Sequence, residues 1–313
     1  MIREKIIIDT DPGQDDAVAI LLALASSEEL NLLGLTTVAG NVPLPLTLKN
    51  ARIICELAKM ENTPIFSGCD RPIKRKLVTA EHVHGKTGLD GITLPEPKMP
   101  IKDIHAVNFI IDTITKHPEN SISICALGPL TNIATALATK PEIATRIKQI
   151  ILMGGAYFEV GNITPAAEFN IYVDPEAAQA VLSSGIKIIM LPLDVTHKAL
   201  ASKERVTAFE KLGTSVGKAV AGWTNFFERF DKEKYGSIGA PLHDPCVIAY
   251  LLEPSIFSGR HINVEIETES DLTRGMTVAD WWRVTDRKPN ALFIGDLDAD
   301  RFFELLTRRL SAL

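Results

Sequence analysis

Short aliphatic runs alternate with amphipathic segments along most of this chain, and that alternation restricts its fold more than any other feature. Unbroken apolar runs are typical of strands buried on both faces of a sheet, and each is followed by a segment of helix length. The order predicts β-α-β units, and therefore an α/β fold whose mainly parallel, Rossmann-like open central sheet is flanked by helices. The expected strands are Ile6–Ile8, Leu32–Val38, Ile122–Ala126, Ile150–Met153, Ile188–Leu191 and Ala291–Ile294, and the expected helices are Asp15–Leu24, Leu44–Lys59, Leu130–Thr139, Asp174–Ser183 and Asp298–Leu310.

The composition fits one folded domain and excludes several classes of partner. The chain has 313 residues, of which 46% are hydrophobic, and no linker, repeat or charge block divides it. We therefore predict a single domain over residues 1–313. The net charge of −6 lacks the basic excess that nucleic acids and anionic membranes attract, so neither is an expected partner.

The amino terminus and the cysteines together predict a cytoplasmic location. The chain enters its first expected strand without the hydrophobic region of a signal peptide. The cysteines are widely spaced and form no C-x-x-C pair, so we expect them to be reduced and buried. They are Cys55, Cys69, Cys125 and Cys246.

Three polar stretches interrupt the alternation, and each is a candidate loop for a site. Residues 68–100 are rich in proline, glycine and charge, residues 154–173 follow an expected strand, and residues 199–245 are expected to be largely helical. Ligands of open α/β sheets bind beyond the carboxyl ends of the strands, where such stretches lie.

Four aspartates follow the first expected strand, in the segment D-T-D-P-G-Q-D-D at residues 9–16. Pro12 and Gly13 turn the chain, so that Asp11, Asp15 and Asp16 can converge on one point. Carboxylate oxygens without a nearby histidine or cysteine favour calcium or magnesium. The alternative is that the acids only cap the following helix, which accounts for one or two of them and not for four.

Three further segments carry polar groups suited to a ligand. His84 begins a glycine-rich segment that either closes over a ligand or is a solvated surface loop. Residues 161–170 combine two amides with a carboxylate, which suits the vicinal hydroxyls of a sugar or, alternatively, a turn. His243 precedes Asp244 at the expected start of an apolar helix, where Asp244 can alternatively act as a cap.

Another class of function stays open from the residues alone. Residues 295–300 read G-D-L-D-A-D, and together with the D-x-D after the first strand they are similar to phosphatases with an aspartate nucleophile. The same segment lies at the expected start of the last helix, where Asp298 can act as the cap. We retain the phosphatase as an alternative.

Taken together, these segments resemble the inosine-uridine preferring nucleoside hydrolases, whose hallmark is the D-x-D-P-G-x-D-D sequence found at residues 9–16. The resemblance runs through most of the chain. It implies a nucleoside hydrolase fold and an N-glycosyl hydrolase that releases ribose and free base from ribonucleosides. The other matching segments are residues 36–41 (TTVAGN), the His84 segment, residues 127–132 (LGPLTN), 153–156 (MGGA), 162–170 and 174–178 (DPEAA), and His243-Asp244.

The resemblance also implies a role for each of the matching residues. A calcium ion would be bound by the carboxylates of Asp11, Asp16 and Asp244 and by the backbone carbonyl of Leu127. Asp11 would take a proton from the attacking water, and His243 would protonate the departing base. The implied substrate contacts are Asp15, Asn41, Asn162, Glu168 and Asn170 at the ribose, His84 and the aromatic segment from Phe226 to Tyr235 at the base, and Met153, Phe169 and Asp244 in the same pocket.

Substrate preference and assembly follow from the same resemblance. Residues 84–91, 161–178 and 194–198 look most like the bacterial pyrimidine-preferring branch, so we expect uridine and cytidine to be preferred over inosine. Gln14 stands where that branch often has histidine, and Asp231 where some members have glutamine. A homotetramer, or a dimer, is expected. The alternative from another class is a non-catalytic nucleoside- or sugar-binding relative, which would lack Asp11 or His243, and both are present.

Overall fold

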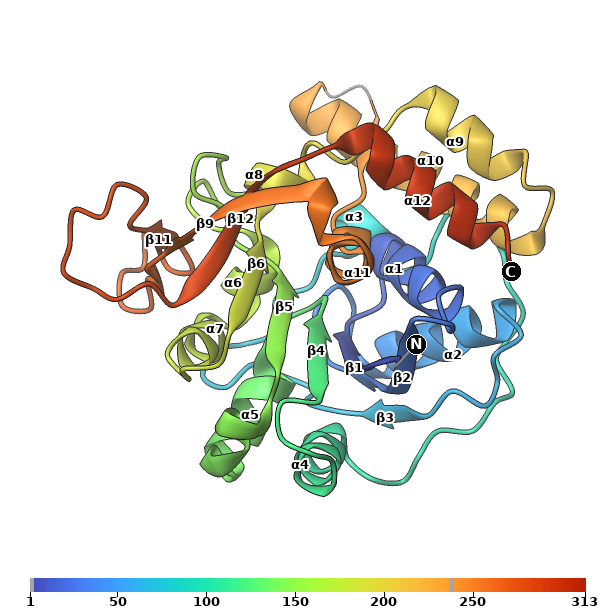
Figure 1. Cartoon of the computed structure of the whole chain (residues 1–313). Helices are drawn as coiled ribbons and strands as arrows, with labels where there is room; N and C mark the ends of the chain where they lie inside the picture. Colours follow the sequence, from blue (N-terminus) through green and yellow to red (C-terminus); the bar gives the residue numbers. More distant parts are fainter. Residues whose placement is uncertain (1–2, 237–238) are drawn as a thin grey trace.

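An eight-stranded sheet forms the centre of the molecule, with helices on both faces (Figure 1). The computed structural model describes residues 3–236 and 239–313, except for the side chains of Asp231 and Tyr235. All neighbours in the order β3-β2-β1-β4-β5-β6-β12 are parallel, and β9 pairs antiparallel with β12 at one edge. The predicted α/β fold is therefore confirmed. The strands are β1 (Glu4–Thr10), β2 (Leu30–Thr37), β3 (Ile65–Ser67), β4 (Ile122–Ala126), β5 (Gln149–Met153), β6 (Ile188–Leu191), β9 (Phe257–Ile262) and β12 (Ala291–Leu297).

Two apolar cores lie between the sheet and its helices. Ile6 and Ile8 point into the core under α1, α2 and α11, whereas Ile7 points into the core under α4, α5 and α7, because side chains alternate along a strand. Among the described helices, none has both the length and the hydropathy needed to cross a bilayer. The longer helices are α1 (Gln14–Leu24), α2 (Leu44–Leu57), α4 (Ala106–Lys116), α5 (Thr131–Thr139), α7 (Pro175–Leu182), α9 (Lys203–Glu210), α10 (Ser215–Tyr235), α11 (Pro245–Leu252) and α12 (Ala299–Leu310).

All the strands and helices that the sequence predicts are present, most of them within two residues of the predicted ends. Sequence analysis does not predict β3, α4 or β9. The four central residues of β9 are exposed, so this edge strand carries no aliphatic run. The described cysteines are all free, and Cys69 is half-buried rather than buried as predicted.

The strand order reverses beside β1, because the chain passes to β2 and β3 on one side and to β4, β5 and β6 on the other. Loops that leave the carboxyl ends of β1 and β4 diverge at this point, and such a crevice is where open α/β sheets bind ligands. The three predicted loop stretches and the segment that follows β6 contribute short elements around it. These elements are α3 (Glu81–His84), α6 (Phe169–Val173), α8 (Leu193–Thr196), β7 (Leu200–Ala201) and β8 (Ala240–Pro241).

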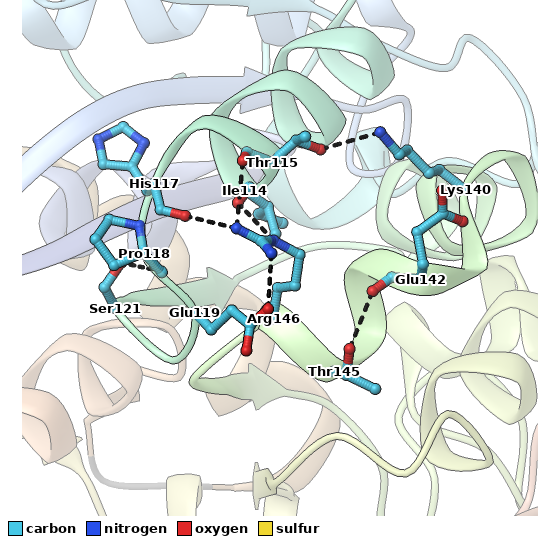
Figure 2. A network of polar contacts seen from close by, with 10 residues as sticks. All are labelled: Ile114, Thr115, His117, Pro118, Glu119, Ser121, Lys140, Glu142, Thr145 and Arg146. Atoms are coloured by element: carbon cyan, nitrogen blue, oxygen red, sulfur yellow. Dashed lines mark hydrogen bonds and ion pairs between the residues drawn. The ribbon is translucent and has the colours of Figure 1, made fainter.

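Arg146 organises the opposite, amino edge of the sheet (Figure 2). Its guanidinium donates to the carbonyl oxygens of Thr115 and His117 at 3.3 and 2.9 Å, and pairs with Glu119 at 2.8 Å. The carbonyl groups at the end of α4 have no partner within the helix, so these bonds satisfy them. Arg146 thereby fixes the turn between α4 and β4.

The carboxyl-terminal acidic segment takes part in local structure. Asp298 accepts a hydrogen bond from the backbone N–H of Arg301 at 3.2 Å and so caps α12, as the alternative interpretation predicted. Asp296 pairs with Lys198 at 2.9 Å. Neither aspartate lines the cavity described below, so the structure gives no support to a phosphatase site.

Candidate active site

An acidic cluster lies beyond the carboxyl end of β1. Pro12 and Gly13 turn the chain into α1, which brings Asp15 and Asp16 back toward the strand end, and α11 begins next to Asp244. Carboxylate oxygens of Asp15, Asp16 and Asp244 all lie within 4.8 Å of one another. All three side chains are buried. The structure thus brings residues 15 and 16 next to residue 244. Of the aspartates to which the resemblance assigns the ion, Asp16 and Asp244 belong to this group and Asp11 does not.

Asp11 borders this cluster and is enclosed by two glycines. Its Oδ2 accepts a hydrogen bond from the backbone N–H of Asn41 at 2.7 Å, whereas no described residue bonds its buried Oδ1. A Cβ at Gly40 would lie 2.0 Å from Oδ2, and one at Gly128 would lie 2.2 Å from Oδ1. Glycine is required at both positions because the two loops pack directly against the carboxylate.

Burial and mutual repulsion make the ionised form of these acids costly. Burial, and next the negative charge of Asp16, raise the pKa of Asp11 well above its usual range and that of Asp15 to about 8. Burial and the other acids of the cluster raise the pKa of Asp244 in the same direction. Several buried carboxylates in one place are stable when a cation shares them. Their hard oxygen donors, with Oδ1 of Asp11 unpaired, fit a divalent ion such as calcium or magnesium.

Helix capping accounts for one member of the cluster. Asp16 accepts from the backbone N–H of Gly13 at 3.0 Å and so caps α1. Asp244 occupies the N-cap position of α11, but its side chain makes no capping hydrogen bond. The capping interpretation of Asp244 therefore finds no support.

Asn170 links the ends of β4 and β5 across the crevice. Its amide N–H groups donate to the carbonyl oxygens of Leu127 at 2.8 Å and Met153 at 3.3 Å. A carbonyl oxygen accepts two hydrogen bonds, so that of Leu127 keeps one lone pair for another partner. Asn41 plays a comparable part on the β2 side, where its amide donates to Asp16 at 3.2 Å.

Glu168 is a buried carboxylate at the start of α6. It accepts backbone hydrogen bonds from Gly155 and Asn170 at 2.9 Å and from Ile171 at 3.2 Å. Burial outweighs these bonds and raises its pKa to about 7. Asn162 holds the same loop in place, because its Oδ1 accepts from the backbone N–H of Phe169 at 2.8 Å.

Two histidines and an aromatic ring form the opposite wall. Burial lowers the pKa of His84 to about 3, and burial followed by the nearby His197 lowers that of His243 well below its usual range. The β7–β8 pair brings residues 199 and 242 together, which places His243 Nδ1 2.8 Å from Oγ1 of Thr196. The ring of Phe227 lies 5.5 Å from that of His84 and 6.1 Å from that of His243.

These groups line one cavity at the carboxyl edge of the sheet. Asp11 and Asp16 are buried and do not line it, and the side chain of Tyr235 is outside the part of the molecule that the structure describes. The predicted residues that line it are Asp15, Asn41, His84, Leu127, Met153, Asn162, Glu168, Phe169, Asn170, His243 and Asp244.

Sequence analysis did not single out several lining residues. Phe227 and Phe230 belong to the aromatic segment that was expected to contact the nucleobase, but the sequence did not show which of its rings line the cavity. His82 precedes His84 by two residues, and His197 lies in the matching segment at residues 194–198. Nδ1 of His197 also lies 3.2 Å from Oε2 of Glu159, a contact that no sequence pattern predicts.

Comparisons with known proteins agree with this geometry. The family model described as inosine-uridine preferring nucleoside hydrolase matches residues 6–304. The chain is 52% identical to an uncharacterised protein of Schizosaccharomyces pombe, with 99% of each covered, and 45% identical to the pyrimidine-specific ribonucleoside hydrolase RihA of Escherichia coli O1:K1, with 97% of each covered. Its fold is similar to the purine-preferring ribonucleoside hydrolase from Gardnerella vaginalis (TM-score 0.91, 32% identity, 98% of each chain) and to the plant nucleoside hydrolase PpNRh1 (TM-score 0.90, 33% identity, 100% of each).

The fold, the acidic cluster and the full-length similarity together define an N-glycosyl hydrolase of ribonucleosides. The chain belongs to the family of inosine-uridine preferring nucleoside hydrolases. The resemblance found in the sequence is thereby confirmed.

Proposed function

We propose that this enzyme hydrolyses the pyrimidine ribonucleosides uridine and cytidine to ribose and free base, with a calcium ion in its acidic cluster. Identity of 45% over nearly the whole chain with a pyrimidine-specific relative supports this base preference. Inosine is the second candidate substrate, because a relative of the same fold at 32% identity is described as purine-preferring.

One observation carries the proposal, namely the buried acidic cluster at the carboxyl ends of the strands. Asp15, Asp16 and Asp244 converge there, and Asp11, whose buried Oδ1 has no described partner, is near enough that, besides burial, the charges of Asp16 and Asp15 raise its pKa. We assign the ion to Asp11, Asp16, Asp244 and the carbonyl oxygen of Leu127, a set of oxygen donors that suits calcium. When bound, calcium supplies positive charge that attracts the ribose hydroxyls and makes a water molecule acidic.

Asp11 acts as the general base in this proposal. Its Oδ1 takes a proton from the attacking water, whose oxygen forms a bond to C1′ of the ribose. The C1′–N bond breaks, and its electron pair leaves with the base. Because Oδ2 is bonded to Asn41, the direction of the carboxylate is fixed before the substrate arrives.

Carboxylates and amides around the sugar stabilise the charge that develops on it. The ribose becomes positive as the base departs, and Asp15 and Glu168 place negative charge beside it. Asn41, Asn162 and Asn170 line the same cavity, and in this proposal they orient the hydroxyl groups. Met153 and Phe169 complete the apolar part of the wall.

His243 acts on the departing base as a hydrogen-bond donor. Its imidazole is neutral, because burial keeps its pKa low, and a neutral imidazole still carries one N–H. We propose that this N–H donates to the base as negative charge builds up on it. Phe227, between His84 and His243, offers the base an aromatic surface for stacking.

A substrate panel tests the activity and the base preference. Release of reducing sugar from uridine, cytidine, inosine, adenosine and their 2′-deoxy forms is measured with the full chain. We expect uridine and cytidine to have the highest kcat/KM and the 2′-deoxy forms to react poorly. Binding of nucleosides without turnover would instead identify the non-catalytic binding relative.

Metal removal tests the assignment of the cluster. Extensive treatment with a chelator is expected to abolish hydrolysis of uridine, and added calcium is expected to restore it. Restoration by magnesium and not by calcium would overturn the choice of ion, and full activity in metal-free protein would overturn the proposed use of the cluster.

We further propose a single domain over residues 1–313, a cytoplasmic location and a homotetramer, or a dimer. Both cores share the one sheet, which supports the single domain. The free cysteines are compatible with a reducing compartment. Light scattering coupled to size-exclusion chromatography measures the number of subunits.

A further inference from the structure

Gln14 makes a set of hydrogen bonds that fixes the orientation of its amide. The side chain is buried, at 2% exposure, in the first turn of α1. Its Nε2 donates to the carbonyl oxygens of His84 at 2.8 Å and Asp90 at 3.0 Å. Both hydrogens of the amide are therefore used, and the amide oxygen is the atom that faces the ring of His84.

That orientation determines which nitrogen of His84 carries hydrogen. Oε1 of Gln14 lies 2.6 Å from Nδ1 of His84. The amide oxygen can only accept, so the contact is a hydrogen bond only when Nδ1 is the donor. With the opposite tautomer, two lone pairs would face each other in a buried position, which is unfavourable.

The other ring nitrogen of His84 has no partner among the described residues. His84 lines the cavity, and no residue that the structure describes bonds its Nε2. Because burial keeps the imidazole neutral, the hydrogen on Nδ1 leaves Nε2 with a lone pair and no hydrogen. His84 then accepts a hydrogen bond and does not donate one at this point.

We propose that Gln14 is a positioning residue, which holds the hydrogen of His84 on Nδ1 so that Nε2 accepts an N–H or O–H of the bound nucleoside. The statement about Nε2 and the nucleoside rests on the proposed function. One consequence concerns catalysis, because His84 in this tautomer has no hydrogen to give to the departing base. That role stays with His243.

The tautomer is read directly by nitrogen–hydrogen correlation NMR of the full chain labelled with ¹⁵N at histidine. The His84 signals are assigned by their loss in His84→Gln. We expect hydrogen on Nδ1 in the unsubstituted protein and loss of this preference in Gln14→Met, which keeps the length of the side chain and removes the acceptor oxygen. Hydrogen on Nε2 in the unsubstituted protein, or an unchanged tautomer in Gln14→Met, would overturn the proposal.

Asn50 provides a matched control for a substitution that only loosens the loop at residues 84–90. Its buried amide also donates to two backbone carbonyls, those of Pro12 at 2.9 Å and Thr87 at 2.8 Å, but it does not contact the imidazole. Asn50→Leu is therefore expected to keep the hydrogen on Nδ1. A tautomer change in Asn50→Leu as large as in Gln14→Met would assign the effect to the loop and contradict the role of Gln14.

Substrate analogues identify the group that His84 contacts. The values of kcat/KM for uridine are compared with those for 5′-deoxyuridine, which lacks one O–H, and 3-methyluridine, which lacks the N–H of the base. One analogue is expected to have a kcat/KM roughly 3- to 10-fold lower than that of uridine, the usual effect of one neutral hydrogen bond. In Gln14→Met, this difference between the analogue and uridine is expected to be smaller. Equal rates for all three substrates would refute the acceptor role. The NMR result needs no substrate, so it holds even if uridine is not hydrolysed.

Discussion

The backbone N–H of Asn41 donates a 2.7 Å hydrogen bond to Oδ2 of Asp11, whereas the described residues provide no partner for the buried Oδ1 of the same carboxylate. The loop after β2 therefore determines the direction of a carboxylate that follows β1. Gly40 is part of this arrangement, because only a residue without a side chain allows the loop to come so close.

Gly40→Ala is expected to lower kcat for uridine by roughly 10²-fold. The new Cβ would lie 2.0 Å from Oδ2 of Asp11, and a displacement of a catalytic group by about 1 Å has an effect of this size. The affinity for calcium, measured by titration calorimetry, is expected to fall as well. Gly295→Ala is the control, because the nearest atom to its Cβ is 3.8 Å away on Trp281. An unchanged kcat in Gly40→Ala would contradict the fixed position of Asp11.

His243→Ala is expected to slow hydrolysis of uridine by roughly 10²–10⁴-fold, the usual contribution of a positioned proton donor. Thr196→Val, which removes the hydroxyl next to Nδ1, is expected to have a smaller effect in the same direction. A riboside of p-nitrophenol needs no proton on its leaving group, so both variants are expected to hydrolyse it at nearly the original rate. An equal loss with both substrates would show that His243 acts elsewhere in the reaction.

Glu168 is expected to produce an acidic limb in the pH dependence of kcat/KM. Its pKa is raised to about 7, so the carboxyl group is ionised above this pH and becomes protonated as the pH falls through it. Protonation removes the negative charge that stabilises the ribose in the transition state, and activity therefore falls below about pH 7. In the calcium-loaded enzyme, where the ion favours the ionised form of Asp15 and the other acids of the cluster, Glu168→Gln is expected to be slower at pH 8 and to lack this limb. A limb unchanged in the variant would assign the titration to another group.

Arg146→Met is expected to lower stability and to leave activity at 25 °C unchanged. The guanidinium makes charge-assisted hydrogen bonds at the end of α4, and their loss costs about 1–3 kcal/mol (Figure 2). Calorimetry is expected to show a lower Tm. Lys116→Met is the comparison, because its ion pair with Asp112 is exposed and contributes at most about 0.5 kcal/mol. Equal Tm values for the two variants would contradict the role of Arg146.

Local patterns predicted most of the fold and of the candidate site. The aliphatic runs identified the buried parallel strands, and the acids after the first strand identified two members of the cluster, because both signals are continuous in sequence. Asp244 was placed with them only through the resemblance to a known family. The edge strand β9 and the short strand β3 were not predicted, since an exposed edge needs no apolar run and three residues give no period.

Contacts between distant segments explain what sequence analysis did not predict. The bond from Gln14 to the ring of His84 joins residues 70 positions apart, and the pair of His197 with Glu159 joins two different loops. Neither pair forms a motif, because each residue is polar and ordinary for its own segment. Burial also decides the charge of His84 and His243, and a sequence position does not reveal the depth at which a side chain lies.

The amino edge of the sheet offers a place to attach the molecule to a support. The short 3-10 helix Pro141–Arg146, which carries Arg146, precedes β5, whereas the cavity opens beyond the opposite ends of the strands. Glu142 is exposed in this helix. An enzyme linked to a resin through a substituted side chain at residue 142 would present its cavity to the flowing solution, which suits continuous conversion of nucleosides.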